Sequence, residues 1–161
     1  MAFIPLTDLT IETANSYCDV TFADSYYSDR NNTTWAGFTT DEKESYLILA
    51  SDYIENIYYG SFIGTAVSNL QSLQFPRLNY AGVTIDYTRV KKAVCELALR
   101  ASSGELISDI GKQTIEETVD VITVKYDKSA DAKTKYPIIS SLLSPLLSNG
   151  NSGINVKVVR V

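Results

Sequence analysis

The sequence predicts a mainly α-helical domain: a small bundle of about four helices with a long central loop or hairpin, a short β element and an extended C-terminal strand. Three observations support this prediction. Apolar residues recur at helical spacing in four segments, a polar and glycine-containing stretch separates the second segment from the third, and β-branched residues gather near residues 112–126 and at the C-terminus. The 161 residues suffice for one domain with a buried core, so we divide the chain into a single domain at 1–150 and an extension at 151–161.

The N-terminal part of the domain is expected to enter the fold as a strand and continue as a helix. Residues 9–13 (LTIET) are apolar and β-branched, which favours a short strand. A first helix is predicted at about 20–30, where apolar and aromatic residues follow helical spacing. Either Asp19 or Thr21 can provide its N-cap, since both side chains carry an oxygen that accepts a backbone N–H bond.

The second predicted helix runs from about 40 to 58 and has a clear start signal. Thr39 and Glu42 have the spacing of a capping box, in which each side chain accepts a hydrogen bond from the other residue's backbone N–H group. Its apolar stripe, close to the helical period, consists of Tyr46, Leu47, Ala50, Tyr53, Ile54, Ile57 and Tyr58.

A long, partly extended loop is predicted at 60–86, with a possible β-hairpin near 78–85. Pro76 excludes a helix at its position, because proline lacks the backbone N–H and clashes with the preceding turn. The third helix is predicted at about 87–103, where apolar residues recur at i, i+3, i+4, i+7, i+8 and i+11. Gly104 is expected to end it.

The C-terminal part combines strands and one more helix. Residues 112–126 are rich in β-branched side chains and are predicted to form a strand. A fourth helix is predicted at about 137–148, with a kink or restart at Pro145. The alternating pattern of 154–161 (INVKVVRV) predicts a terminal strand, which could pair with 118–126 or join a sheet in another subunit.

The composition removes several chemistries. The chain has no histidine, so no imidazole can act as a general base or bind a metal. Cys18 and Cys95 are too few for a four-thiolate zinc site or a disulfide scaffold. We therefore expect no enzyme activity, no catalytic residues, no metal and no cofactor. No run of about 18 apolar residues and no basic leader are present, so we also expect no membrane segment.

Charge and tyrosine content each have two interpretations. The uneven charge fits either two solvated faces of one domain or complementary surfaces of a self-associating protein, and the tyrosines fit either core and boundary positions or a subunit interface. Residues 1–60 carry ten acidic and two basic side chains, a net charge of −8, whereas 61–161 carry a net charge of +3. Copies that associate head to tail, as the subunits of a ring do, need two different complementary surfaces on each subunit. The charge asymmetry can supply these two surfaces. Aromatic residues are enriched at interfaces, and the candidates for a subunit interface are Tyr26, Tyr27, Trp35, Tyr58 and Tyr59.

The long loop contains a candidate anchor. Phe75 and Pro76 are apolar and rigid, and Arg77 follows them directly. We expect Arg77 to fix the loop through a buried ion pair or through contacts with carbonyl groups, with Gln71 in the same segment. Alternatively, Phe75 packs while Arg77 stays solvated.

Several segments occur together in an order that resembles one protein family. In chain order they are Asn15-Ser16-Tyr17, Ala23-Asp24-Ser25-Tyr26 with Trp35, the Leu47–Tyr53 run, Gln71–Arg77 (QSLQFPR), Val90–Ala98 (VKKAVCELA), Val124-Lys125-Tyr126 and Leu142–Leu147 (LLSPLL). They resemble the head–tail adaptor proteins of tailed bacteriophages, also called connector or head-completion proteins, and within them the branch described as DnaT-like single-stranded-DNA-binding proteins. The resemblance spans about 9–148. It departs from the family at Asp86-Tyr87-Thr88, where members often carry a proline.

This resemblance implies a structural virion protein. Such adaptors form a dodecameric ring that connects the portal at the capsid vertex to a downstream tail or nozzle protein. The ring lines the channel through which double-stranded DNA passes without sequence-specific binding. The expected location is the neck of the virion, and the host cytoplasm during assembly. The expected portal-docking tail comprises Ile154, Val156, Lys157, Val158, Arg160 and Val161.

Two other functions remain open from the sequence. The first is single-stranded-DNA binding, against which stand a sequence pI near 4.7 and the lack of basic and aromatic residues interleaved along the chain. The second is a tail-terminator or tail-tube component, which would also assemble into rings. Those proteins are β-rich, so a mainly helical chain argues against this alternative.

Overall fold

The computed structural model describes residues 2–107, 116–119, 122–125 and 136–148. Within these residues the chain is mainly helical, which confirms the predicted fold class. The helices are α1 (Val20–Ser28), α2 (Thr33–Ala36), α3 (Thr40–Ile57), α4 (Thr88–Ala101) and α5 (Pro137–Leu143), followed by a 3-10 turn, η1 (Ser144–Leu146). The strands are β1 (Thr65–Ala66), β2 (Arg77–Leu78), β3 (Glu116–Val119) and β4 (Ile122–Lys125). The predicted extension at 151–161 lies outside the described residues.

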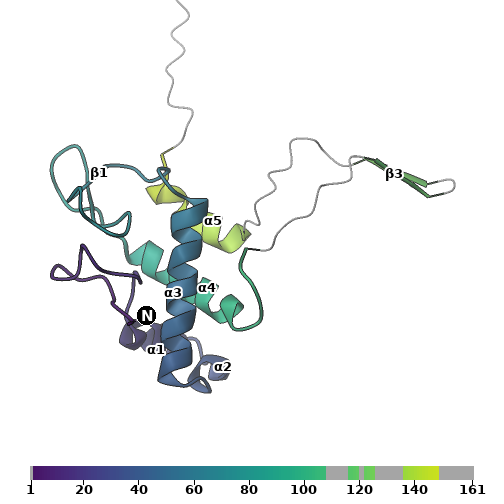
Figure 1. Ribbon diagram of the computed structural model, residues 1–161, viewed down its shortest axis with the longest axis horizontal. Coiled ribbons are helices and arrows are strands. Elements are labelled where there is room, and N and C mark those ends of the chain that lie inside the picture. The colour runs from purple at the N-terminus through teal and green to yellow at the C-terminus, as the bar shows by residue number, and fades with distance from the viewer. Residues whose placement is uncertain (1, 108–115, 120–121, 126–135, 149–161) are drawn as a thin grey trace, which may run out of the picture.

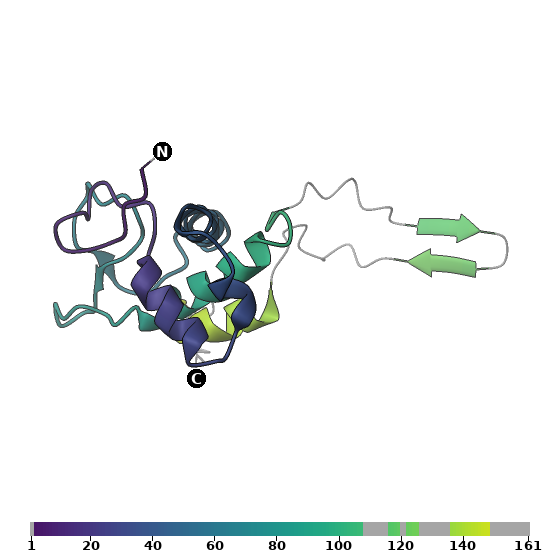
Figure 2. The ribbon, with the colours of Figure 1, turned by 90° about the horizontal axis from the view of Figure 1, so that it is seen from below.

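Helix α3 is the long central element, and the other helices are arranged around it (Figure 1). α4 packs across α3, and α5 packs against α4. α1 contacts both α3 and α4, and α2 lies beside α1 near the start of α3 (Figures 1 and 2). The bundle therefore places one side of α1 next to one side of α4, although their sequences are about 60 residues apart.

The start of α3 has the geometry that its sequence predicts. The Glu42 side chain accepts a hydrogen bond from the Thr39 backbone N–H at 2.8 Å, and the Thr39 hydroxyl accepts one from the Glu42 N–H at 3.4 Å. The hydrogen bonds from the Thr39 backbone and hydroxyl lower the pKa of Glu42. For α1, Asp19 is the cap, because its carboxylate accepts from the Phe22 N–H at 2.7 Å.

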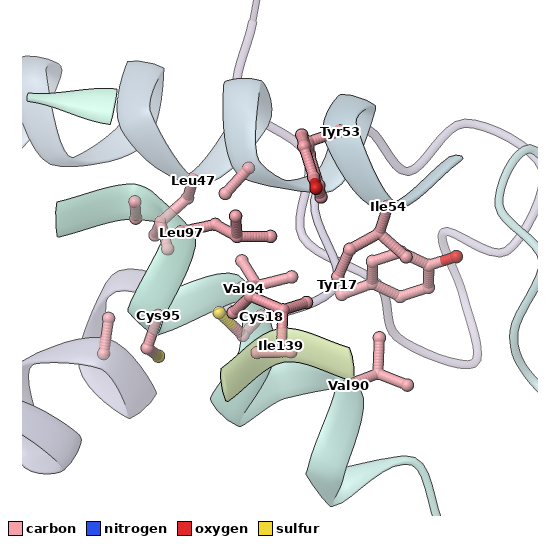
Figure 3. Packing of buried hydrophobic residues seen from close by; sticks show 14 of the residues in the cluster. Tyr17, Cys18, Leu47, Tyr53, Ile54, Val90, Val94, Cys95, Leu97 and Ile139 are labelled. Carbon is pink, nitrogen blue, oxygen red and sulfur yellow. The ribbon is translucent and has the colours of Figure 1, made fainter. Parts of the chain in front are cut away.

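The described residues share one hydrophobic core, which is centred where α3, α4 and α5 meet (Figure 3). Its largest fully buried side chains are Trp35, Tyr17, Tyr53, Phe75, Leu47, Ile54, Leu97, Ile139, Leu143, Val90, Val94 and Cys18. The predicted apolar positions of α3 and α4 contribute many of them, so helical periodicity identified most of the helical core. Trp35 and Phe75 come from outside the long helices.

The N-terminal expectations need two corrections. Residues 9–13 form turns rather than a strand, with hydrogen bonds from the Thr13 and Ala14 N–H groups to the Thr10 carbonyl, and Leu9 is 97 % exposed. The Thr10 hydroxyl also donates to the Pro5 carbonyl, and such local bonds compete with strand pairing. The short helix α2 was not predicted, because four residues are too few to show a helical period.

The long loop contains more pairing than the sequence indicates. β1 and β2 form an antiparallel pair, and Leu78 also bridges Thr84, which places a tight turn within the hairpin region predicted near 78–85. Gly64 has a φ of +77°, and a Cβ there would collide with the Leu78 carbonyl oxygen. Only glycine therefore allows the two segments to approach this closely.

The C-terminal elements refine two predictions. The predicted strand at 112–126 contains two short antiparallel strands, β3 and β4, with Val119 opposite Ile122. The predicted helix at 137–148 ends at Leu143 and continues as η1, in which Pro145 occupies a first-turn position. This is the restart expected at Pro145, because proline is accepted where its missing N–H has no helical partner.

Candidate functional site

The packing of α1 against α4 places basic side chains at the surface beside aromatic rings, of which Phe22 and Tyr87 are partly exposed and Tyr26 is buried. We call this surface the α1–α4 face and define it by Phe22, Tyr26, Arg30, Tyr87, Lys91 and Lys92. Phe22 and Tyr26 are four residues apart on α1, and Arg30 lies in the turn just after its end. Tyr87, the N-cap residue of α4, and Lys91 are likewise four residues apart. The contact between the two helices brings the six side chains together, whereas their order along the sequence shows no interleaving.

The cations of this face lie against its aromatic rings. The Arg30 guanidinium carbon is 3.5 Å from the Tyr26 ring centroid, and Arg30 Nη1 donates to the Tyr26 carbonyl at 2.8 Å. Lys91 Nζ is 5.5 Å from the Phe22 ring centroid and 5.2 Å from that of Tyr87. These distances are within the range of cation–π attraction, which holds the two basic groups at defined places on the surface.

A hollow of about 250 Å³ lies within the face. Its lining residues are Phe22, Ser25, Tyr26, Asp29, Arg30 and Lys92. Asp29 offsets part of the positive charge there, and the nearby Glu96 carboxylate accepts from the Tyr26 hydroxyl at 2.9 Å and pairs with Arg100 at 3.2 Å. Burial and the Glu96 hydrogen bond raise the pKa of Tyr26 to about 12, so this phenol stays protonated at neutral pH. The face therefore offers Arg30, Lys91 and Lys92 to an anionic ligand.

The predicted loop anchor has a clear geometry. Arg77 donates to the carbonyls of Ile63 at 2.8 Å, Gly64 at 2.6 Å and Gln74 at 3.4 Å. Phe75 is fully buried, and the Phe75–Pro76 peptide bond is cis. In the same loop, Gln71 donates to the Leu73 carbonyl at 2.7 Å and accepts from the Ser68 N–H at 3.1 Å. Of the two expected partners for Arg77, the structure places carbonyl groups rather than a carboxylate beside it.

Arg77→Ala is expected to lower the free energy of unfolding by about 1–3 kcal/mol, because it leaves three carbonyl groups without their charged donor. Arg77→Lys should recover only part of the loss, since an ammonium group cannot reproduce the planar fork of a guanidinium. Urea denaturation measures both, with the exposed Arg89→Ala as the matched control. Equal stability of Arg77→Ala and Arg89→Ala would show that Arg77 does not anchor the loop.

A buried polar network links the N-terminal segment, α3 and the long loop. The fully buried Tyr17 donates its phenol to the Glu55 carboxylate, and the Gln74 N–H donates to the same carboxylate at 3.2 Å. Burial raises the pKa of Glu55, although the hydrogen bonds from Tyr17 and Gln74 oppose this effect. The sequence does not predict this network, because Tyr17, Glu55 and Gln74 are far apart in the chain and no local pattern links them.

Glu55→Gln is expected to stabilise the protein increasingly as the pH rises. Because the pKa of Glu55 is higher in the folded chain than its ordinary 4.5, the folded state binds more protons than the unfolded state above that pH. The contribution of Glu55 to the free energy of unfolding is therefore fully present below its ordinary pKa. This contribution is lost as the pH rises through the pKa that Glu55 has in the folded chain. The amide of the variant does not titrate, so its unfolding free energy should lack this decline.

Denaturation at several pH values between about 4 and 8 measures this difference. Glu12→Gln removes the same charge at an exposed position and is the matched control. If the unfolding free energy of Glu55→Gln depended on pH as strongly as that of the wild type, Glu55 would not have a raised pKa in the folded chain.

Four of the five candidate interface residues lie inside the chain. Tyr26, Tyr27, Trp35 and Tyr58 are each at most 8 % exposed, whereas Tyr59 is 79 % exposed. Tyr27 stacks on Trp35, whose indole N–H donates to Asp24 at 2.7 Å. Their apolar area is therefore used mainly within the subunit, and among these five only Tyr59 presents a large surface to a neighbour.

The last features to place are the two cysteines, possible metal ligands, possible membrane helices and the C-terminal tail. Cys18 and Cys95 are both buried, and a hydrogen bond with Cys18 together with burial raises the pKa of Cys95. No cluster of three or more cysteine and carboxylate side chains there could hold a metal ion. None of the described helices is both long and apolar enough to cross a membrane. The candidate portal-docking tail lies outside the described residues.

Comparison with known proteins identifies a family. The family described as "Putative DnaT-like ssDNA binding protein" matches residues 1–161, which is the whole chain. No curated protein and no solved structure matches the chain.

Proposed function

The chain belongs to the DnaT-like single-stranded-DNA-binding family, and from this membership together with the α1–α4 face we propose that it binds single-stranded DNA. The observation that carries the proposal is the position of Arg30, Lys91 and Lys92 among aromatic rings on one surface. Proteins that bind single strands without sequence preference combine a basic path for the backbone with aromatic side chains for the bases.

The geometry suggests how the strand would lie. Lys92 and Arg30 line the hollow and would hold phosphates, while the exposed parts of the Phe22 and Tyr87 rings would contact bases. The net charge of −5 repels a polyanion at long range, so binding depends on these few local contacts. We therefore expect modest affinity that decreases steeply with salt. No catalytic step is part of this function.

Fluorescence anisotropy with a labelled oligonucleotide tests the proposal. We expect binding of single strands at low salt, with log K falling against log salt with a slope of about −2 if three phosphates are contacted. A duplex of the same length should bind more weakly, because its bases are not available for stacking. Absence of binding to single strands at about 25 mM salt would overturn the proposal.

A second candidate function is that of a head–tail adaptor in a bacteriophage virion. Besides the sequence resemblance, one observation favours it: β3 and β4 pair only with each other among the described strands, and their ribbon lies away from the helices (Figure 2). An isolated two-stranded hairpin is marginally stable in water. Neighbouring copies in an assembly would supply the missing contacts.

In this second function the chain forms a ring, expected to be dodecameric, at the neck of the virion. Its partners would be further copies of itself, the portal protein, a downstream tail or nozzle protein and the double-stranded DNA that passes through. Residues 154–161 would dock on the portal. The mainly helical structure gives no support to the third alternative, a β-rich tail-terminator or tail-tube protein.

Negative-stain imaging of the chain mixed with its portal tests the second function. A ring covering the narrow end of the portal is expected, and a chain that stays separate from the portal would contradict the proposal. Deletion of 152–161 should abolish the contact if the C-terminal segment makes it. Because this assay contains no single-stranded DNA, its result is independent of the anisotropy measurement.

A further inference from the structure

An apolar groove opens where α3 passes the end of α4. It has a volume of about 430 Å³ and is lined by Leu49, Tyr53, Ala101, Gly104, Glu105, Leu106 and Ile107. Leu49 is 51 % exposed and Ile107 is 45 % exposed, although both are large aliphatic residues. The groove is separate from the α1–α4 face, since the two share no lining residue.

The edge of the groove is acidic. Glu105 is part of the lining, and Asp52 is exposed on α3, three residues after Leu49 and therefore on a neighbouring part of the same helix surface. An apolar floor with carboxylates at its edge favours an extended segment that carries aliphatic side chains on one side and cations beside them.

Residues 154–161 of this chain have that chemistry. Ile154, Val156 and Val158 alternate along the segment, and Lys157 and Arg160 are its charged residues, both basic. Alternate positions of an extended chain point to one side, so the three aliphatic side chains can enter a groove together. Arg160 follows Val158 on the same side and can meet the carboxylates at the edge of the groove, whereas Lys157 points to the opposite side.

The connection is long enough to bring this segment to the groove of the same chain. The described chain ends at Ser148, whose N–H donates to the Ser61 carbonyl at 2.7 Å just beyond the end of α3. α3 ends at Ile57, four residues after Tyr53, which is about 6 Å at the helical rise, and Ser61 lies in the turn beyond that end. The five residues 149–153 can span about 17 Å. A connector this short gives a high effective concentration, which favours the groove of the same chain over that of another copy.

We propose that residues 154–161 occupy the groove of their own chain in an extended conformation, with Ile154, Val156 and Val158 against Leu49 and Ile107. The groove is then a site that recognises an aliphatic, basic strand. Any partner that binds residues 154–161 must compete with the groove for this segment. When the segment leaves, the groove becomes exposed. This inference is independent of whether the protein binds DNA or serves as an adaptor.

Limited trypsin digestion of the full chain tests the proposal. Trypsin cleaves after Lys157 and Arg160, and mass spectrometry follows the loss of the C-terminal peptides. A docked segment is protected, because a protease must bind its substrate in an accessible, extended form. Leu49→Ser should accelerate these cleavages about fivefold or more, since it removes apolar contact from the half-exposed wall of the groove.

Leu70→Ser is the matched control, because Leu70 is 69 % exposed and lies outside the groove, and it should leave the cleavage rates unchanged. Ile107→Ser should repeat the effect of Leu49→Ser, and unchanged cleavage within α4 excludes general unfolding as its cause. Protection that rises with protein concentration would overturn the proposal in favour of docking on a second copy. Equal cleavage of the wild type, Leu49→Ser and Ile107→Ser would also overturn it.

Discussion

Phe75→Ala is expected to lower the free energy of unfolding by about 3–5 kcal/mol, the largest effect on stability among the substitutions considered. Phe75 is fully buried although it belongs to the long loop. Its ring centroid lies 4.9 Å from that of Phe62 and 5.7 Å from that of Tyr87, and 6.3 Å from that of Tyr17 in a T-shaped arrangement. Removing the ring leaves a cavity between three aromatic side chains from separate segments, so nearby atoms cannot easily fill it.

Guanidinium denaturation followed by tryptophan fluorescence measures this loss. Trp35 is the single tryptophan and is 1 % exposed, so its emission reports on core integrity. Tyr80→Ala is the matched control: Tyr80 is a fully exposed aromatic residue of the same loop, and its loss should change stability by less than about 0.5 kcal/mol. A cost below about 1 kcal/mol for Phe75→Ala would show that the loop is not part of the core.

The elements that the sequence predicts correctly are those whose stability is local. α3 combines a capping box at Thr39 with a regular apolar stripe, and α4 has the same regular stripe. Such signals are complete within about 18 residues, so no distant contact is needed to recognise them. The kinked fourth helix could be predicted for the same reason, since Pro145 acts on its own turn.

The strand predicted at 9–13 is wrong because side-chain hydrogen bonds decide the local structure. Thr7 and Thr10 bond to each other through their hydroxyls at 2.8 Å, and Thr10 also bonds to the Pro5 carbonyl. β-branched residues favour strands only where a neighbouring strand is available for pairing. Pro5 and Ser16 form an isolated bridge, and the Ile11 carbonyl accepts from the Ser72 N–H at 2.9 Å, but residues 9–13 join no described strand pair.

The α1–α4 face could not be predicted from the sequence, because it depends on how two helices pack. Phe22 and Lys91 are 69 positions apart, yet the Lys91 ammonium lies 5.5 Å from the Phe22 ring centroid. Basic and aromatic residues are not interleaved along the chain, which is the pattern that a sequence alone can show. Searching each predicted helix for an exposed side with both residue types would have identified α1 and α4 separately, but not their contact.

Neutralising the α1–α4 face is expected to reduce single-stranded-DNA affinity more than any other change of equal charge. In the triple variant Arg30→Gln, Lys91→Gln, Lys92→Gln, the salt dependence of log K should become shallower by about 2, because each lost phosphate contact on a single strand removes about 0.7 from the slope. Affinity at low salt should fall by about tenfold or more. Fluorescence anisotropy across a salt series measures both quantities.

Single substitutions separate a local contact from a change in overall charge. Lys92→Gln and Lys43→Gln each remove one positive charge. Lys92 lines the hollow of the α1–α4 face. Lys43 belongs to α3 and pairs with Asp24 at 2.9 Å. Lys92→Gln should weaken binding and reduce the salt slope, while Lys43→Gln should leave the slope unchanged. If both variants weaken binding equally, the DNA responds only to net charge, and the α1–α4 face is not its binding site. The family membership would then be compatible with DNA binding elsewhere on the chain, and the position of the rings beside Lys91 would serve packing alone.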